Sequence, residues 1–95
     1  MRVYISGAIS NDLWHYKEKF KRAHDKLTKE GHIVLDPSLL PLGLDADKYM
    51  PICFAMIDAS DAIYMLYDCK TSKGASLELQ YAKYQKKIVL KEDIE

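Results

Sequence analysis

The sequence predicts an α/β fold in which helices cover both faces of a four-stranded parallel sheet. Short runs rich in β-branched and aromatic residues alternate with longer segments of helical periodicity along all 95 residues. This alternation is typical of parallel sheets with crossover helices. The chain contains no internal repeat, low-complexity stretch or linker. We therefore expect residues 1–95 to form one domain. The strand order that we expect for its sheet is 2-1-3-4.

The N-terminal third predicts a strand and a helix. Residues 2–6 (RVYIS) are a buried strand by composition, and Gly7 ends it. Asn11 and Asp12 can cap a helix that Gly31 terminates. The apolar stripe of this helix follows helical spacing and comprises Leu13, Tyr16, Phe20, Ala23 and Leu27.

A second strand and a second helix follow. Residues 33–35 (IVL) predict the strand, and residues 36–44, with two prolines and a glycine, predict a loop. Asp45 and Asp47 suit the N-terminus of the next helix. Its expected buried face comprises Met50, Cys53, Phe54 and Ile57.

The remaining elements complete the alternation. Residues 62–67 (AIYMLY) predict a third strand, Ser72 can cap a third helix that ends near Gln85, and residues 87–91 (KIVLK) predict a fourth strand. The result is a three-layer fold of the flavodoxin- or Rossmann-like kind.

Charge and composition exclude several classes of function. Fourteen basic residues balance 14 acidic ones, so no global field favours a nucleic acid polymer or an acidic membrane. Neither the two cysteines nor the three histidines have the spacing of a metal site. No apolar run reaches the roughly 18 residues of a membrane span, and Met1 leads directly into a strand rather than a signal peptide. We expect a cytoplasmic protein with no cofactor and a small-molecule partner.

The stretch TSKGASLELQYA places a glycine and a glutamate one helical turn apart. Helical side chains tilt toward the N-terminus, so Glu78 should lean over Gly74, where no side chain covers the backbone. This end of the helix lies at the carboxyl edge of the sheet, where ligands of parallel α/β folds bind. Glu78 is thus a candidate functional residue, although a solvated helix residue would give the same pattern.

The first strand also ends in a candidate loop, YISGAIS. Ser6 and Gly7 belong to a strand-to-helix turn of small residues that can present backbone N–H groups to an anion. The turn has neither the GxGxxG fingerprint nor the GK[ST] of a P-loop. By itself it indicates only that an anionic ligand is feasible.

Three motifs together resemble the nucleoside 2-deoxyribosyltransferase-like superfamily. They are YISGAIS, YMPICFAMIDASDAIYML and TSKGASLELQYA, in that order along almost the whole chain. The nearest branch is the small group called domain of unknown function 4406. The resemblance implies that Glu78, at the end of S-x-G-x-x-x-E, is the nucleophile that attacks an anomeric carbon, which would give hydrolysis or transfer of a (deoxy)ribosyl group.

The resemblance also assigns neighbouring residues. Tyr4 matches an aromatic hydroxyl that positions the nucleophile, with a core tyrosine as the alternative. Ser72 matches the serine of relatives that hydrolyse nucleoside 5′-monophosphates, where it helps hold the phosphate beside Gly74. A simple N-cap would look the same. Active relatives are commonly dimers or larger, so a homo-oligomer is expected, with Tyr81 and Tyr84 as interface candidates.

One position departs from the family pattern. Many relatives carry an aspartate on the second helix where this chain has Cys53, which is neutral unless its pKa is lowered. Asp68, after the third strand, and Asp47 (or Asp45) are replacement candidates for sugar contact or proton handling. Asp61 should lie at the opposite edge of the sheet, because the strand between spans roughly 20 Å.

Two classes of function therefore remain open. The first is an enzyme that cleaves or transfers at the N-glycosidic bond of nucleotides or nucleosides. The second is a non-catalytic module that binds a nucleotide or phosphosugar on the same fold, because Cys53 replaces a needed acid.

Overall fold

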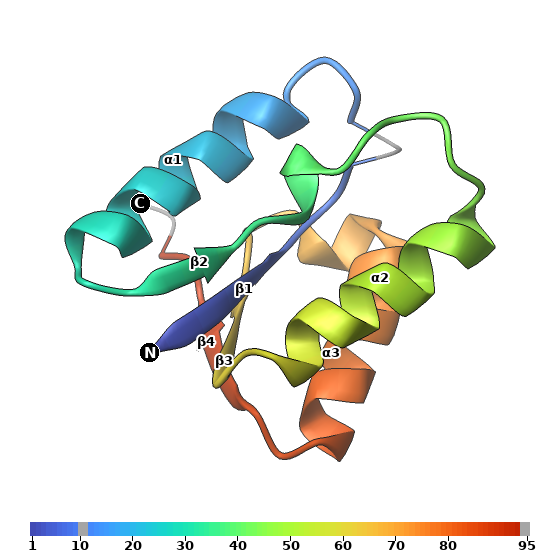
Figure 1. Cartoon of the computed structure of the whole chain (residues 1–95). Coiled ribbons are helices and arrows are strands. Elements are labelled where there is room, and N and C mark those ends of the chain that lie inside the picture. The colour runs from blue at the N-terminus through green and yellow to red at the C-terminus, as the bar shows by residue number, and fades with distance from the viewer. Residues whose placement is uncertain (10–11, 94–95) are drawn as a thin grey trace.

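The computed structural model describes residues 1–9 and 12–93. Four strands among them form the predicted sheet (Figure 1). Its strands are β1 (Arg2–Ser6), β2 (Ile33–Leu35), β3 (Ala62–Met65) and β4 (Ile88–Lys91). They pair in parallel in the order β2-β1-β3-β4, so the predicted fold class and topology are confirmed. Ser10 and Asn11, the latter a predicted helix cap, lie outside the described residues.

Helices cover both faces of the sheet. Helix α1 (Tyr16–Lys29) lies on one face, and α2 (Ala46–Asp58) and α3 (Lys73–Tyr84) lie on the other (Figure 1). Short 3-10 turns, η1 (Pro37–Leu39) and η2 (Cys69–Thr71), follow β2 and β3. None of the described helices is long and apolar enough to cross a membrane.

The alternation of side chains along β1 supplies both cores. Val3 and Ile5 pack with α1, whereas Tyr4 packs with α2 and α3 and Ser6 bonds to α3. Where α2 meets α3, the rings of Phe54 and Tyr81 stack at 4.2 Å. The layer between the sheet and α2–α3 therefore holds four residues of the predicted site, Tyr4, Ser6, Cys53 and Glu78.

Helix α1 begins later than predicted, and Leu13 is not part of its buried stripe. The chain turns before the helix: the Tyr16 amide donates to the Asp12 carbonyl at 2.9 Å, and Leu13 is 60% exposed. The Asp12 side chain does not cap the helix, because its carboxylate binds the ammonium of Lys19. Tyr16, Phe20, Ala23 and Leu27 are buried as predicted.

Strand β3 is shorter than predicted, since it ends at Met65 rather than at Tyr67. The Leu66 amide still bonds to the Ser6 carbonyl at 2.8 Å, but the Cys69 amide then donates to the Leu66 carbonyl at 3.0 Å and closes a turn. This early turn brings the start of α3 close to the end of β1.

The other two helices begin where the sequence predicts. Helix α2 starts directly after Asp45, although the Asp45 side chain makes no capping hydrogen bond. On its inner face Cys53 and Ile57 are buried, whereas Met50 and Phe54 are half-buried. The Ser72 hydroxyl caps α3 by accepting the Ala75 amide at 3.1 Å.

Candidate active site

An open cavity of about 710 Å³ lies at the carboxyl edge of the sheet. The loops after β1, β2 and β3 and the N-terminal turns of α2 and α3 form its walls. Most of the lining surface is apolar, and Glu78 and Lys73 are its charged side chains among the described residues. This is the edge at which parallel α/β folds bind ligands.

Glu78 is buried at the border of this cavity. Its residue is 8% exposed, so a solvated helix glutamate is ruled out. The Ser6 hydroxyl, at the end of β1, donates to its Oε1 at 2.7 Å. Burial raises the pKa of Glu78 from 4.5 to about 7, while hydrogen bonds from Ser6, Tyr4 and Cys53 partly oppose the rise. A carboxyl group with such a pKa is available near neutral pH both as a proton carrier and as a nucleophile.

Tyr4 and Cys53 adjoin this carboxyl group from β1 and α2. The Tyr4 hydroxyl is buried and has no partner with full hydrogen-bond geometry, yet it lies close enough to Glu78 and Cys53 to interact with both. Burial, and then the charge of Glu78, raise the pKa of Tyr4 well above 10. Burial raises the pKa of Cys53 to about 11. Both groups are therefore neutral hydrogen-bonding neighbours of Glu78.

The first turn of α3 presents Ser72, Lys73 and Gly74 to the cavity. A Cβ added to Gly74 would meet only the Ser72 Oγ, at 3.8 Å, so the space in front of this turn is open. Glu78 follows one turn later, as the sequence predicts. The predicted N-cap at Ser72 and the predicted uncovered backbone at Gly74 are thus both present, at a helix N-terminus that faces the cavity.

Gly7 and Ser6 have different positions at the end of β1. Gly7 lines the cavity, and a Cβ there would come within 2.6 Å of the Leu66 Cδ1, so the tight packing of β1 against β3 needs a glycine. Ser6 is fully buried, and its hydroxyl is engaged by Glu78. Of the two residues predicted in the loop after β1, the structure thus places Gly7 in the cavity wall and Ser6 against Glu78.

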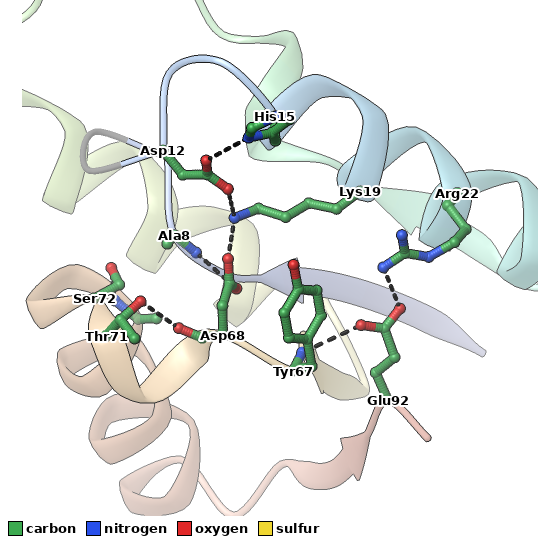
Figure 2. Close-up of polar contacts among 11 residues, drawn as sticks. Ala8, Asp12, His15, Lys19, Arg22, Tyr67, Asp68, Thr71, Ser72 and Glu92 are labelled. Atoms are coloured by element: carbon green, nitrogen blue, oxygen red, sulfur yellow. Dashed lines mark hydrogen bonds and ion pairs between the residues drawn. The ribbon is translucent and has the colours of Figure 1, made fainter. Parts of the chain in front are cut away.

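The predicted replacement acids do not join Glu78. Asp68 accepts the Ala8 amide at 3.3 Å and pairs with Lys19 (Figure 2). It is not among the residues that line the cavity. Asp47 is exposed on α2, with Lys48 3.8 Å away. Asp61 lies at the opposite edge as predicted, where it binds Arg2 at 2.9–3.3 Å.

Comparison with known proteins identifies the family. The model of the family described as "Domain of unknown function (DUF4406)" matches residues 1–91. The chain belongs to the DUF4406 family. Among solved structures, it resembles a 2-deoxyribosyltransferase from Leishmania mexicana, with a TM-score of 0.72 and 21% identity. The similarity covers 95% of this chain but 62% of that one, and at this identity it establishes a shared fold. No curated protein matches this chain in sequence.

The motif-based assignment is therefore confirmed at the level of family and fold. In this DUF4406 chain, sequence reasoning missed one residue, Lys19, which is buried beside the first loop. Its position offered a signal, since it lies on the same helical face as Tyr16 and Ala23. A lysine on a buried stripe needs a buried acid as its partner. No group of three possible metal ligands gathers anywhere in residues 1–9 or 12–93.

Proposed function

We propose that the protein cleaves the N-glycosidic bond of (deoxy)nucleoside 5′-monophosphates or nucleosides, with Glu78 as the nucleophile. The supporting observation is a buried carboxyl group, with a pKa of about 7, held by Ser6 at the border of an open cavity. Its ionised oxygen attacks the anomeric carbon, and the bond to the base breaks. The base leaves with the electron pair and takes a proton. Water then hydrolyses the glycosyl ester, or a second base accepts the sugar.

Tyr4 has the role of positioning the carboxylate in this proposal. Its hydroxyl is buried beside Glu78 and has no partner with full hydrogen-bond geometry. It can therefore form a stronger hydrogen bond when the Glu78 carboxyl group is ionised. Asp68, a predicted catalytic residue, is engaged by Lys19 and the Ala8 amide. We therefore propose that solvent, rather than Asp68 or Asp47, donates the proton that the leaving base takes up.

A 5′-phosphate is the group we assign to the N-terminal turn of α3. Helix N-termini attract anions through free amides and the helix dipole. Here Gly74 leaves the backbone uncovered, Lys73 adds a positive charge, and Gly7 lets the opposite loop approach. These features favour nucleotides over free nucleosides.

Ser72→Asp tests this preference, because aspartate caps a helix as well as serine does. The variant should fold normally and lose base release from nucleotides, whose phosphate the new charge repels, while release from nucleosides persists. Free base would be measured by chromatography for matched nucleotide and nucleoside pairs. Equal losses on both substrate types would contradict the phosphate assignment.

A second candidate is a nucleotide-binding module without turnover. It is favoured by Cys53, whose thiol is neutral at a position where the resemblance to the superfamily implies an aspartate. This alternative predicts that nucleotides raise the melting temperature of the wild type but are not cleaved. Cys53→Asp would then restore base release, and its failure to do so would contradict the assignment of position 53 to the acid of the family pattern.

We also propose that the chain works as a homo-oligomer. Aliphatic side chains remain exposed around the cavity mouth, among them Leu13, Leu42 and Leu77. Tyr84 is 81% exposed, whereas Tyr81 is stacked on Phe54. Sedimentation equilibrium should give a mass above that of one chain, and a monomer at micromolar concentration would contradict this expectation.

A further inference from the structure

Lys19 is a buried cation held between two loops (Figure 2). The residue is 2% exposed, and its Nζ donates to Asp12 Oδ2 at 2.6 Å and to Asp68 Oδ2. Asp12 belongs to the loop after β1, and Asp68 belongs to the loop after β3. One ammonium group therefore joins two segments that are far apart in sequence.

The same contacts fix the β1–α1 loop at two points. The second oxygen of Asp68 accepts the amide of Ala8, near the start of the loop, while Lys19 holds Asp12 near its end. His15 adds a contact to the other oxygen of Asp12 at 3.3 Å. Both ends of this segment are thus anchored to the turn that precedes α3.

These anchored loops form neighbouring walls of the cavity. Gly7, Ile9 and Leu13 come from the β1–α1 loop, and Thr71 and Ser72 come from the turn before α3. Lys19, Asp12 and Asp68 themselves stand behind these walls. A displacement of either loop would change the distance between Gly7 and Ser72, whereas the carboxyl group of Glu78 is held by Ser6, the last residue of β1.

A buried ion pair is a costly way to fill space, because desolvation offsets much of the attraction between the charges. An apolar residue at position 19 would continue the stripe of Tyr16, Phe20 and Ala23 just as well. Charged groups instead impose a fixed geometry on their partners. This argues that the three residues serve the placement of the loops.

We propose that Lys19 is a positioning residue, which sets the width of the substrate cavity by holding Asp12 and Asp68 together. The part of this inference that concerns substrate rests on the proposed function. The part that concerns the loop does not, since the anchoring of Ala8 can be measured without any ligand.

Asp12→Asn and Asp68→Asn test the proposal. The amide introduced by Asp68→Asn would keep an acceptor for the Ala8 N–H but lose the ion pair, and Asp12 is a quarter exposed, so neither change should prevent folding. Asp61→Asn is the matched control, because it breaks the Arg2–Asp61 pair at the opposite edge of the sheet. Hydrogen exchange of the Ala8 amide reports on the loop, and titration with common deoxynucleoside 5′-monophosphates reports on the cavity.

In Asp12→Asn and Asp68→Asn we expect about tenfold faster Ala8 exchange and about tenfold weaker nucleotide binding, the scale of one lost charge-assisted bond. The KM should rise while kcat stays near the wild-type value. Asp61→Asn should lower only the melting temperature. Wild-type exchange in both variants, or faster exchange with unchanged affinity, would overturn the proposal. If the wild type binds no nucleotide, the proposed function fails, and the Ala8 exchange alone decides whether Lys19 fixes the loop.

Discussion

The Ser6 hydroxyl donates a 2.7 Å hydrogen bond to the buried carboxyl group of Glu78, 72 residues away in sequence. This bond joins the last residue of β1 to the second turn of α3 and leaves the carboxyl at the cavity border. It favours the charged form of Glu78, whereas burial favours the neutral form. The balance between the two effects sets when the carboxylate is available.

The burial of Glu78 predicts a pH-dependent stability difference between the wild type and Glu78→Gln. The pKa is raised from 4.5 to about 7 in the folded protein, so the native state binds this proton more tightly than the unfolded state does. The contribution of Glu78 to stability is complete below about pH 4.5 and is lost as the pH rises through 7. Relative to Glu78→Gln, the wild type should lose about 3 kcal/mol between these limits. Urea unfolding at pH 4.5 and pH 8 measures the difference, and a constant difference would contradict it.

Ser6→Ala should raise the pKa of Glu78 by about one unit, since it removes a hydrogen bond to the charged form. A carbon-13 NMR titration of the glutamate carboxyl groups measures this pKa without any substrate. Ser60→Ala is the control: Ser60 is equally buried, but its hydroxyl bonds to the Met56 carbonyl at 2.8 Å. If both variants titrate alike, Ser6 does not tune Glu78.

Tyr4→Phe and Tyr64→Phe should have similar effects on stability but different effects on Glu78. Both hydroxyls are buried without a full hydrogen-bond partner, so each deletion should be neutral or stabilising by up to about 1 kcal/mol. Only Tyr4 lies in the core cluster on the α2–α3 side, where its hydroxyl lowers the pKa of Glu78. The NMR titration should shift upward in Tyr4→Phe alone. A large loss of stability in Tyr4→Phe would indicate that its hydroxyl has a strong partner.

Gly74→Ala and Gly7→Ala should have opposite effects on stability. A methyl group at Gly74 meets open space and should stabilise α3 by up to about 1 kcal/mol. At Gly7 it would clash with Leu66, at a cost of about 1–3 kcal/mol. Gly74→Ala should nevertheless weaken nucleotide binding, because the methyl group occupies the space in front of the helix N-terminus. Thermal unfolding with and without nucleotide distinguishes the effects, and unchanged binding would show that the ligand lies elsewhere.

Local sequence patterns predicted the fold and the position of Glu78 well. The parallel sheet followed from the alternation of elements, and the pairing of Gly74 with Glu78 followed from helical geometry. The order 2-1-3-4 was expected without such a derivation. Where these predictions failed, tertiary contacts compete with local preference. Asp12 would be a good helix cap, but Lys19 engages its carboxylate. Residues 62–67 read as one strand, but the chain turns after Met65.

The environment of Glu78 was harder to predict, because its partners Ser6, Tyr4 and Cys53 come from two other elements, β1 and α2. Ser6 was expected to face a ligand, yet its hydroxyl faces Glu78. Asp68 follows β3 as expected, but its carboxylate is turned toward Lys19, and Lys19 belongs to none of the three motifs. Periodicity indicates which face of a helix is buried; it does not indicate which buried polar groups meet.

The most direct test of the proposed function is the rate of base release from nucleotides by the wild type and by Glu78→Gln, with peptide mapping of rapidly quenched reactions. The account predicts release by the wild type, a glycosyl ester on the peptide that contains Glu78, and no release by the variant, which retains nucleotide binding. Base release by Glu78→Gln at the wild-type rate, or an adduct on another residue, would contradict it.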